Sequence, residues 1–132
     1  MARVEIDTAG WIRGDTEAET VEVQMRYDAS DPFAVTLAVN GPQGKDTWVF
    51  GRDLLADGLR SMVPVGEGAV QVQATSVLTE ITYLDLDGRS TTLRLPWWNT
   101  REFIRLSQEA VARGDERCDV DSWVMALTDQ ES

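Results

Sequence analysis

The sequence predicts an α+β fold built on antiparallel β-sheet, with a short central helix and a longer C-terminal helix. Most segments alternate apolar and polar residues with a period of two, which is typical of half-buried strands. Two other segments carry apolar residues at helical spacing, and each follows a run of strand-like segments. The predicted order is therefore strands, short helix, strands, longer helix.

The first run of strands begins at RVEIDTAGWIR, residues 3–13, where Val4 and Ile6 share one face and Gly10 predicts a bulge or a bend. TVEVQMRY, residues 20–27, alternates more regularly. The acidic GDTEAE between these segments is expected to form a solvated hairpin loop. FAVTLAVN and DTWVFG predict a third and a fourth strand on either side of the loop-forming NGPQG.

The short helix is predicted from RDLLADGL, residues 52–59. The alternation stops there, and Leu55 and Leu59 lie four positions apart, so that they share one helix face. Gly58 stands where helices commonly end. The segment is long enough for about two turns.

The second run of strands is expected to form a meander. GEGAVQVQATSVL opens with a glycine-rich turn and continues with Val70, Val72 and Ala74 in step. EITYLDL and STTLRLPW follow, separated by Asp87-Gly88, which is a strong signal for a hairpin.

The longer helix is predicted to begin near Asn99, because Asn99 and Glu102 resemble a capping box with Asn in the Ser/Thr place. Apolar residues at helical spacing continue from there to Gly114. These residues are Phe103, Leu106, Ala110 and Val111.

At 132 residues the chain is expected to be one domain, 1–132, that buries a core without disulfides or metals. Its last part, 115–132, begins and ends acidic around an apolar WVMAL. This part is either an ordered tail that packs on the sheet or on a partner, or a flexible acidic tail.

Charge and residue usage narrow the functional classes. The formal charge is −11, and nucleic acid is therefore an unfavourable partner, since phosphate binding usually shows as a basic patch. The single cysteine, Cys118, and the absence of histidine remove disulfides and the usual zinc, haem and Cys/His sites, so no cofactor is expected. The sequence shows no signal-peptide core and no stretch of about 20 apolar residues, which predicts a soluble, cytoplasmic protein without a membrane span.

Two acidic segments resemble sites but are better read as turns. Asp28 and Asp31 in YDASDP are close enough for paired carboxylates, yet aspartates commonly cap turns and Asp31-Pro32 opens the next strand. DLDGR, residues 85–89, mimics the start of a calcium loop without its remaining ligands. No catalytic or metal residue is assigned.

Tryptophan is frequent for a chain of this length. Tryptophans on a sheet can stack nucleic-acid bases, but base stacking needs surrounding cations to hold the backbone. The core or an oligomer interface is the more favoured place for them. The five are Trp11, Trp48, Trp97, Trp98 and Trp123.

Three stretches together resemble the SsgA-like proteins of actinomycete sporulation and cell division. They are RYDASDPFAV at 26–35, WVFGRDLLADGL at 48–59 and GEGAVQV at 66–72, in this order. Among the matching residues, the candidates for the family motif or for interaction are Tyr27, Asp28, Asp31, Pro32, Trp48, Arg52, Asp53, Leu55, Gly58 and Leu59. Arg52, Asp53 and the turn aspartates are candidates either for surface contact or for folding.

The resemblance implies a non-enzymatic adaptor that helps to localise or activate the septum machinery, through the tubulin-like division protein FtsZ, an SsgA-like paralogue or septal wall synthesis. It also implies a Whirly-like fold, a homotrimer and a place at the division septum. Because Whirly proteins bind single-stranded nucleic acid, such binding is the alternative function. An enzyme is the third choice, since no nucleophile, base or metal constellation can be assembled.

Overall fold

The computed structural model describes residues 2–14, 17–42, 44–66 and 68–116. Its elements are β1 (Arg3–Arg13), β2 (Glu19–Asp28), β3 (Ala34–Gly41), β4 (Gly44–Gly51), α1 (Arg52–Gly58), β5 (Val70–Ala74), β6 (Leu78–Leu84), β7 (Ser90–Pro96) and α2 (Trp97–Ala110). The predicted order of strands, short helix, strands and longer helix is confirmed.

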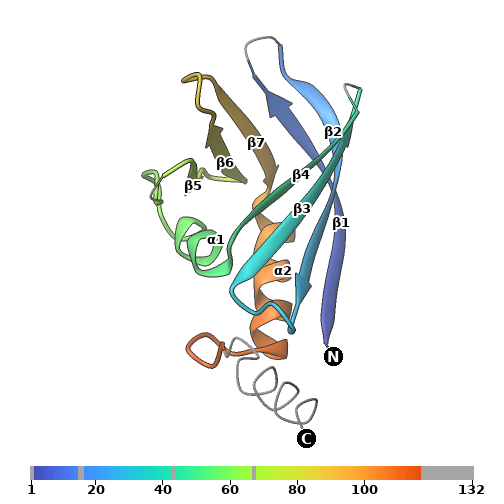
Figure 1. The fold of residues 1–132 in the computed structure, drawn as a ribbon, viewed down its shortest axis with the longest axis vertical. Coiled ribbons are helices and arrows are strands. Elements are labelled where there is room, and N and C mark those ends of the chain that lie inside the picture. Colours follow the sequence, from blue (N-terminus) through green and yellow to red (C-terminus); the bar gives the residue numbers. More distant parts are fainter. Residues whose placement is uncertain (1, 15–16, 43, 67, 117–132) are drawn as a thin grey trace, which may run out of the picture.

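The strands form one antiparallel, seven-stranded sheet in the order β4-β3-β2-β1-β7-β6-β5. Its two halves join where β1 pairs with β7, beginning at Trp11 opposite Arg94. Figure 1 shows β1 to β4 on one side of the molecule and β5 to β7 on the other, with α1 and α2 inside the curve. The sheet is a half-barrel, and the ring of Trp48 on β4 lies 6.1 Å from the ring of Tyr83 on β6.

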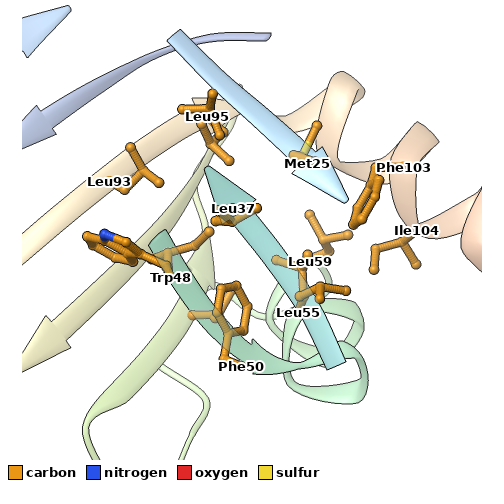
Figure 2. Close-up of a cluster of buried hydrophobic side chains, with 14 of the residues drawn as sticks. Met25, Leu37, Trp48, Phe50, Leu55, Leu59, Leu93, Leu95, Phe103 and Ile104 are labelled. Atoms are coloured by element: carbon orange, nitrogen blue, oxygen red, sulfur yellow. The ribbon is translucent and has the colours of Figure 1, made fainter. Parts of the chain in front are cut away.

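The core fills the inside of this curve. Alternation in β2 is confirmed, because its inward residues are buried while its outward residues are polar. Figure 2 shows side chains of the sheet meeting those of both helices. The labelled residues are Met25, Leu37, Trp48, Phe50, Leu55, Leu59, Leu93, Leu95, Phe103 and Ile104. Full burial of one such side chain contributes about 1.5–3 kcal/mol, so this cluster is the main source of stability.

Of the bulge or bend predicted at Gly10, the bulge is wrong. The pairing of β1 with β2 runs without interruption through Gly10, which lies opposite Val21. A Cβ at this position would lie 2.8 Å from Leu95 Cδ2 and 2.9 Å from the carbonyl oxygen of Arg94. Glycine is present because β7 approaches closely at the junction of the two halves.

The predicted meander is confirmed, because β6 pairs antiparallel with both β5 and β7. At the hairpin tip, Gly88 has φ +81, a left-handed conformation that favours glycine. Asp85 Oδ1 accepts the backbone N–H groups of Asp87 and Arg89, both at 2.9 Å. Asp85–Arg89 therefore forms a hairpin tip, as expected.

The capping box predicted at Asn99 is wrong. Helix α2 begins at Trp97, directly after Pro96, and no side chain caps it. Asn99 instead donates from Nδ2 to Thr8 Oγ1 at 2.8 Å, and Glu102 pairs with Arg105 one turn later. Pro96 is the last residue of β7 and lies opposite Leu78, and a proline preceding the first helical residue costs no helical hydrogen bond, so the helix can start directly after the strand.

The predicted tail 115–132 lies outside the described residues, apart from Asp115 and Glu116. In the described part of the chain, no helix has the length and apolar character needed to cross a membrane.

Candidate functional site

Some of the residues that carry the family resemblance gather around one buried arginine. Arg52 is the first residue of α1 and is 1% exposed. Its backbone N–H donates to the carbonyl of Phe33 at 2.8 Å, which fixes the start of the helix against the β2–β3 connection. The guanidinium therefore points into the protein, between the sheet and α2.

The guanidinium of Arg52 ties the end of α2 to the start of α1. Nη1 donates to the carbonyls of Ser107 at 2.9 Å and Val111 at 2.6 Å, and Nη2 donates to Glu116 Oε1 at 2.6 Å. The carbonyl of Ser107 also accepts the backbone N–H of Val111 at 2.9 Å. Carbonyls at the end of a helix carry partial negative charge, so a cation stabilises them. Nε is buried without a partner in the described part of the chain.

Tyr27 forms the opposite wall of this cluster. The Arg52 guanidinium lies 4.8 Å from the centroid of the Tyr27 ring, within the range of a cation–π contact. The Tyr27 hydroxyl donates to the carbonyl of Pro32 at 3.1 Å, and burial raises the pKa of Tyr27. We call Tyr27, Pro32, Arg52, Ser107, Val111 and Glu116 the Arg52 cluster.

Asp28 and Asp31 shape the turn that carries Pro32 into this cluster. Asp28 Oδ1 accepts the backbone N–H of Ser30 at 2.9 Å and its hydroxyl at 2.8 Å, and these bonds lower the pKa of Asp28. The backbone N–H of Asp31 donates to the carbonyl of Asp28 at 2.9 Å. The Asp28 side chain and the Asp31 backbone thus stabilise the turn, and the described residues contain no group of three or more side chains able to hold a metal ion.

Sequence reasoning missed Glu116, which lies 64 positions from Arg52 and in the segment expected to be a tail. Its side chain is 6% exposed, and the hydrogen bond from Arg52 lowers its pKa. Arg113, just before it, binds both carboxylate oxygens of Asp57 and lies 3.4 Å from Asp53. The resemblance singles out Arg52, but nothing local in the sequence shows that it is buried or identifies its partner.

The remaining residues of α1 serve packing. Leu55 is fully buried and Leu59 is 6% exposed. Gly58 lies against β5, where a Cβ would come within 2.3 Å of Val72 Cγ1 and 3.0 Å of the Val72 backbone carbon. Only glycine permits this distance between α1 and β5 without a shift.

Trp48 lies apart from the Arg52 cluster, on β4. Its ring is 8% exposed, and Nε1 donates to Asp46 Oδ2 at 3.2 Å. The structure therefore unites Tyr27, Pro32 and Arg52 directly, brings Asp53 near them through Arg113, and leaves Trp48 at the edge of the sheet.

A family model described as Streptomyces sporulation and cell division protein, SsgA, matches residues 21–116. The SsgB of Saccharopolyspora erythraea is 47% identical over 57 residues, which cover 42% of this chain and 40% of that protein. The SsgB of Salinispora tropica is 30% identical over 132 residues, which cover 94% and 92%. Both are named sporulation-specific cell division proteins. A third protein with that description, from Frankia casuarinae, is 38% identical over 65 residues, covering 49% of this chain and 43% of its own. The matches to the first relatives thus span about two-fifths of their length.

Two solved structures share the fold. One, from work relating mutations in SsgB to longitudinal cell division during sporulation of Streptomyces coelicolor, has a TM-score of 0.76 and 28% identity, covering 87% of this chain and 93% of its own. The other, an SsgA-like sporulation-specific cell division protein from Thermobifida fusca, has a TM-score of 0.81 and 20% identity, covering 96% of each chain. The half-barrel with two helices is common to all three.

Proposed function

The chain belongs to the SsgA family of sporulation and cell division proteins, and from this premise we propose that it is a non-enzymatic adaptor in sporulation-specific cell division. The observation that carries the proposal is the Arg52 cluster. It places the resembling residues Tyr27, Pro32 and Arg52 inside the protein, where they hold α1, α2 and the β2–β3 turn together. A buried structural role for these residues suits a protein that works through its surface.

The surface offers apolar side chains for protein contacts. Exposed fractions reach 84% for Met62, 69% for Trp98, 67% for Val77 and 66% for Val63. Backbone hydrogen bonds connect their segments, since Ala74 donates to the carbonyl of Ser61, and Trp97 to that of Val77. Clustered exposed apolar residues commonly mark sites where other proteins or other copies of the chain bind.

The finer proposal is a cytoplasmic protein at the division septum that forms a homotrimer with a Whirly-like fold. It localises or activates the septum machinery by binding FtsZ, an SsgA-like paralogue or a component of septal wall synthesis. The exposed apolar cluster supports assembly through protein surfaces. The family role is cell division during sporulation, and the proposal adds these partners and this assembly for the individual chain.

The experiment is co-sedimentation of the purified chain with polymerised FtsZ, alone and with an SsgA-like paralogue added as a bridge. We expect the chain in the pellet in at least one of these mixtures and in the supernatant without FtsZ. If the chain stays in the supernatant in every mixture, and septal wall enzymes also fail to retain it, the adaptor proposal is wrong.

A second candidate function is Whirly-like binding of single-stranded nucleic acid. It is favoured by Arg101, whose guanidinium lies 5.5 Å from the Trp97 ring centroid and 5.3 Å from that of Trp98. Aromatic rings next to a cation are used for base stacking. Labelled single-stranded DNA tests this function, because it requires an increase in polarisation at low salt that salt then reverses. An unchanged polarisation removes this candidate.

A further inference from the structure

The two edge strands of the half-barrel differ in how far they are covered. The outer edge of β5 is closed by the preceding segment: Val65 and Val72 exchange two backbone hydrogen bonds of 2.8 Å, and Ala74 donates to the carbonyl of Ser61 at 2.7 Å. No described segment covers β4 in this way. An open edge strand presents unpaired backbone groups and can accept another strand.

The unpaired groups of β4 can be assigned from its pairing with β3. Arg52 N–H donates to the carbonyl of Phe33, so the backbone groups of Arg52 point towards the chain that pairs with β4. Along an antiparallel strand, residues whose backbone groups point to the partner alternate with residues whose groups point away. Thr47 and Val49 lie at odd separations from Arg52, and their backbone groups therefore point away from β3. Asp46 Oδ1 accepts the Thr47 N–H at 2.9 Å. Val49 is 60% exposed, and its outward N–H and carbonyl have no partner in the described part of the chain.

A groove of about 410 Å³ lies beside this edge, between β4 and the β5–β7 half of the sheet. Trp48 and Tyr83 contact one another across it, and Phe50 and Val70 add apolar surface. Its charged lining residues are Asp46 and Asp85, and no described lysine or arginine lines it. The groove therefore combines apolar side chains with polar ones, and the charges that line it are negative.

We propose that β4 binds an extended segment of a partner protein as an added strand, and that this segment carries lysine or arginine next to apolar side chains. The outward backbone groups of Val49 pair with the segment, the groove takes its apolar side chains, and Asp46 and Asp85 attract its cations. This inference deepens the proposed adaptor function and rests on it, because it names the kind of partner that the surface fits.

A second copy of the chain is a poorer occupant. Pairing of two β4 strands brings two copies of Asp46 to one interface, and each chain carries a formal charge of −11. Two acidic chains repel one another, and this repulsion disfavours the pair. A basic segment meets no such repulsion.

The test uses the full chain and a short labelled peptide in which arginine alternates with valine and threonine. We expect saturable binding that weakens with salt, together with slower hydrogen exchange at the Val49 amide. The same peptide with alternate backbone nitrogens methylated keeps its charge but cannot pair as a strand, so we expect it not to protect Val49.

Matched variants separate backbone pairing from charge. Val49→Pro removes the outward N–H and leaves the bonds to β3, whereas Val49→Ala shortens the side chain and keeps the N–H. We expect about fivefold to tenfold weaker peptide binding for Val49→Pro and a smaller change for Val49→Ala.

The charge variants concern Asp85 and Asp87. Asp85→Asn is expected to weaken peptide binding at low salt by about threefold. Asp87→Asn makes the same charge change outside the groove lining and is expected to leave peptide binding unchanged. Circular dichroism verifies that each variant is folded.

Three results would overturn the inference. They are no peptide binding, peptide binding that leaves hydrogen exchange at the Val49 amide unchanged, or a light-scattering mass of a dimer for the unchanged chain and of a monomer for Val49→Pro. The third would assign β4 to self-association. Because co-sedimentation with FtsZ involves no peptide, failure of the strand proposal is distinguishable from failure of the adaptor proposal.

Discussion

Nη2 of Arg52 lies 2.6 Å from Oε1 of Glu116, although the two residues are 64 positions apart in the chain. The two side chains are 1% and 6% exposed. This contact fastens the segment that follows α2 onto the first turn of α1. The end of the described chain is therefore part of the packed structure.

Arg52→Met is expected to destabilise the protein by about 3–5 kcal/mol, because it leaves the Glu116 carboxylate and the carbonyl of Val111 without the donor that binds them. The free energy of unfolding in urea measures this loss. Arg60→Met is the control, since Arg60 is exposed, and we expect it to change stability by less than about 0.5 kcal/mol. Equal losses in the two variants would show that the Arg52 cluster does not stabilise the fold.

Glu116→Gln tests the charge of this contact through its dependence on pH. The folded pKa of Glu116 is lowered by Arg52, so the stabilisation is complete above the ordinary glutamate pKa of about 4.3 and disappears as pH falls through the lower folded value. We expect the variant to be less stable by about 1–3 kcal/mol near pH 7 and the difference to vanish in acid.

Urea unfolding of the chain and of Glu116→Gln at several pH values provides this measurement. Glu22→Gln makes the same change in formal charge at an exposed strand position, and it controls for net charge. A stability difference for Glu116→Gln that is independent of pH would contradict an ion pair with Arg52.

Tyr27→Phe is expected to cost about 1–2 kcal/mol, because it leaves the buried carbonyl of Pro32 without the tyrosine hydroxyl. The measurement is again the free energy of unfolding. Tyr83→Phe is the matched control, since Tyr83 is 43% exposed and water can replace any bond of its hydroxyl. If both variants lose the same stability, the bond between Tyr27 and Pro32 makes no specific contribution.

Gly58→Ala is expected to destabilise the protein by about 1–3 kcal/mol, although alanine favours a helix by about 1 kcal/mol relative to glycine. The new Cβ would lie 2.3 Å from Val72 Cγ1, so α1 must move away from β5. Thermal unfolding of each variant measures this loss. Gly51→Ala, where the nearest atoms to the new Cβ are 3.9 Å away, is expected to be nearly neutral in that measurement. A stabilised Gly58→Ala protein would contradict the close approach of α1 to β5.

Local patterns predicted the elements well, and distant contacts account for what they missed. Alternation identified the strands, and Asp87-Gly88 identified a hairpin, because the information lies within a few residues. At Gly10 the local pattern predicts a bulge or a bend, whereas the reason for a glycine there, the approach of Leu95, lies on β7. The start of α2 was placed too late, since Asn99 binds Thr8 on β1 instead of capping the helix.

Three residues of the Arg52 cluster were predictable, but the rest of the cluster and the way its members meet were not. Tyr27, Pro32 and Arg52 were singled out by the resemblance alone, and neither spacing nor composition indicates that they converge. Their meeting point requires Ser107 and Glu116, which approach Arg52 only after α2 packs against the sheet. Long-range contacts of this kind are invisible to local patterns.

The most direct test of the central claim is the location of a fluorescent fusion of the chain in sporulating cells of its own host, imaged together with FtsZ. The adaptor account predicts bands of the fusion that coincide with FtsZ at forming septa. A folded fusion that stays diffuse throughout septation, in cells whose septa form normally, would contradict it.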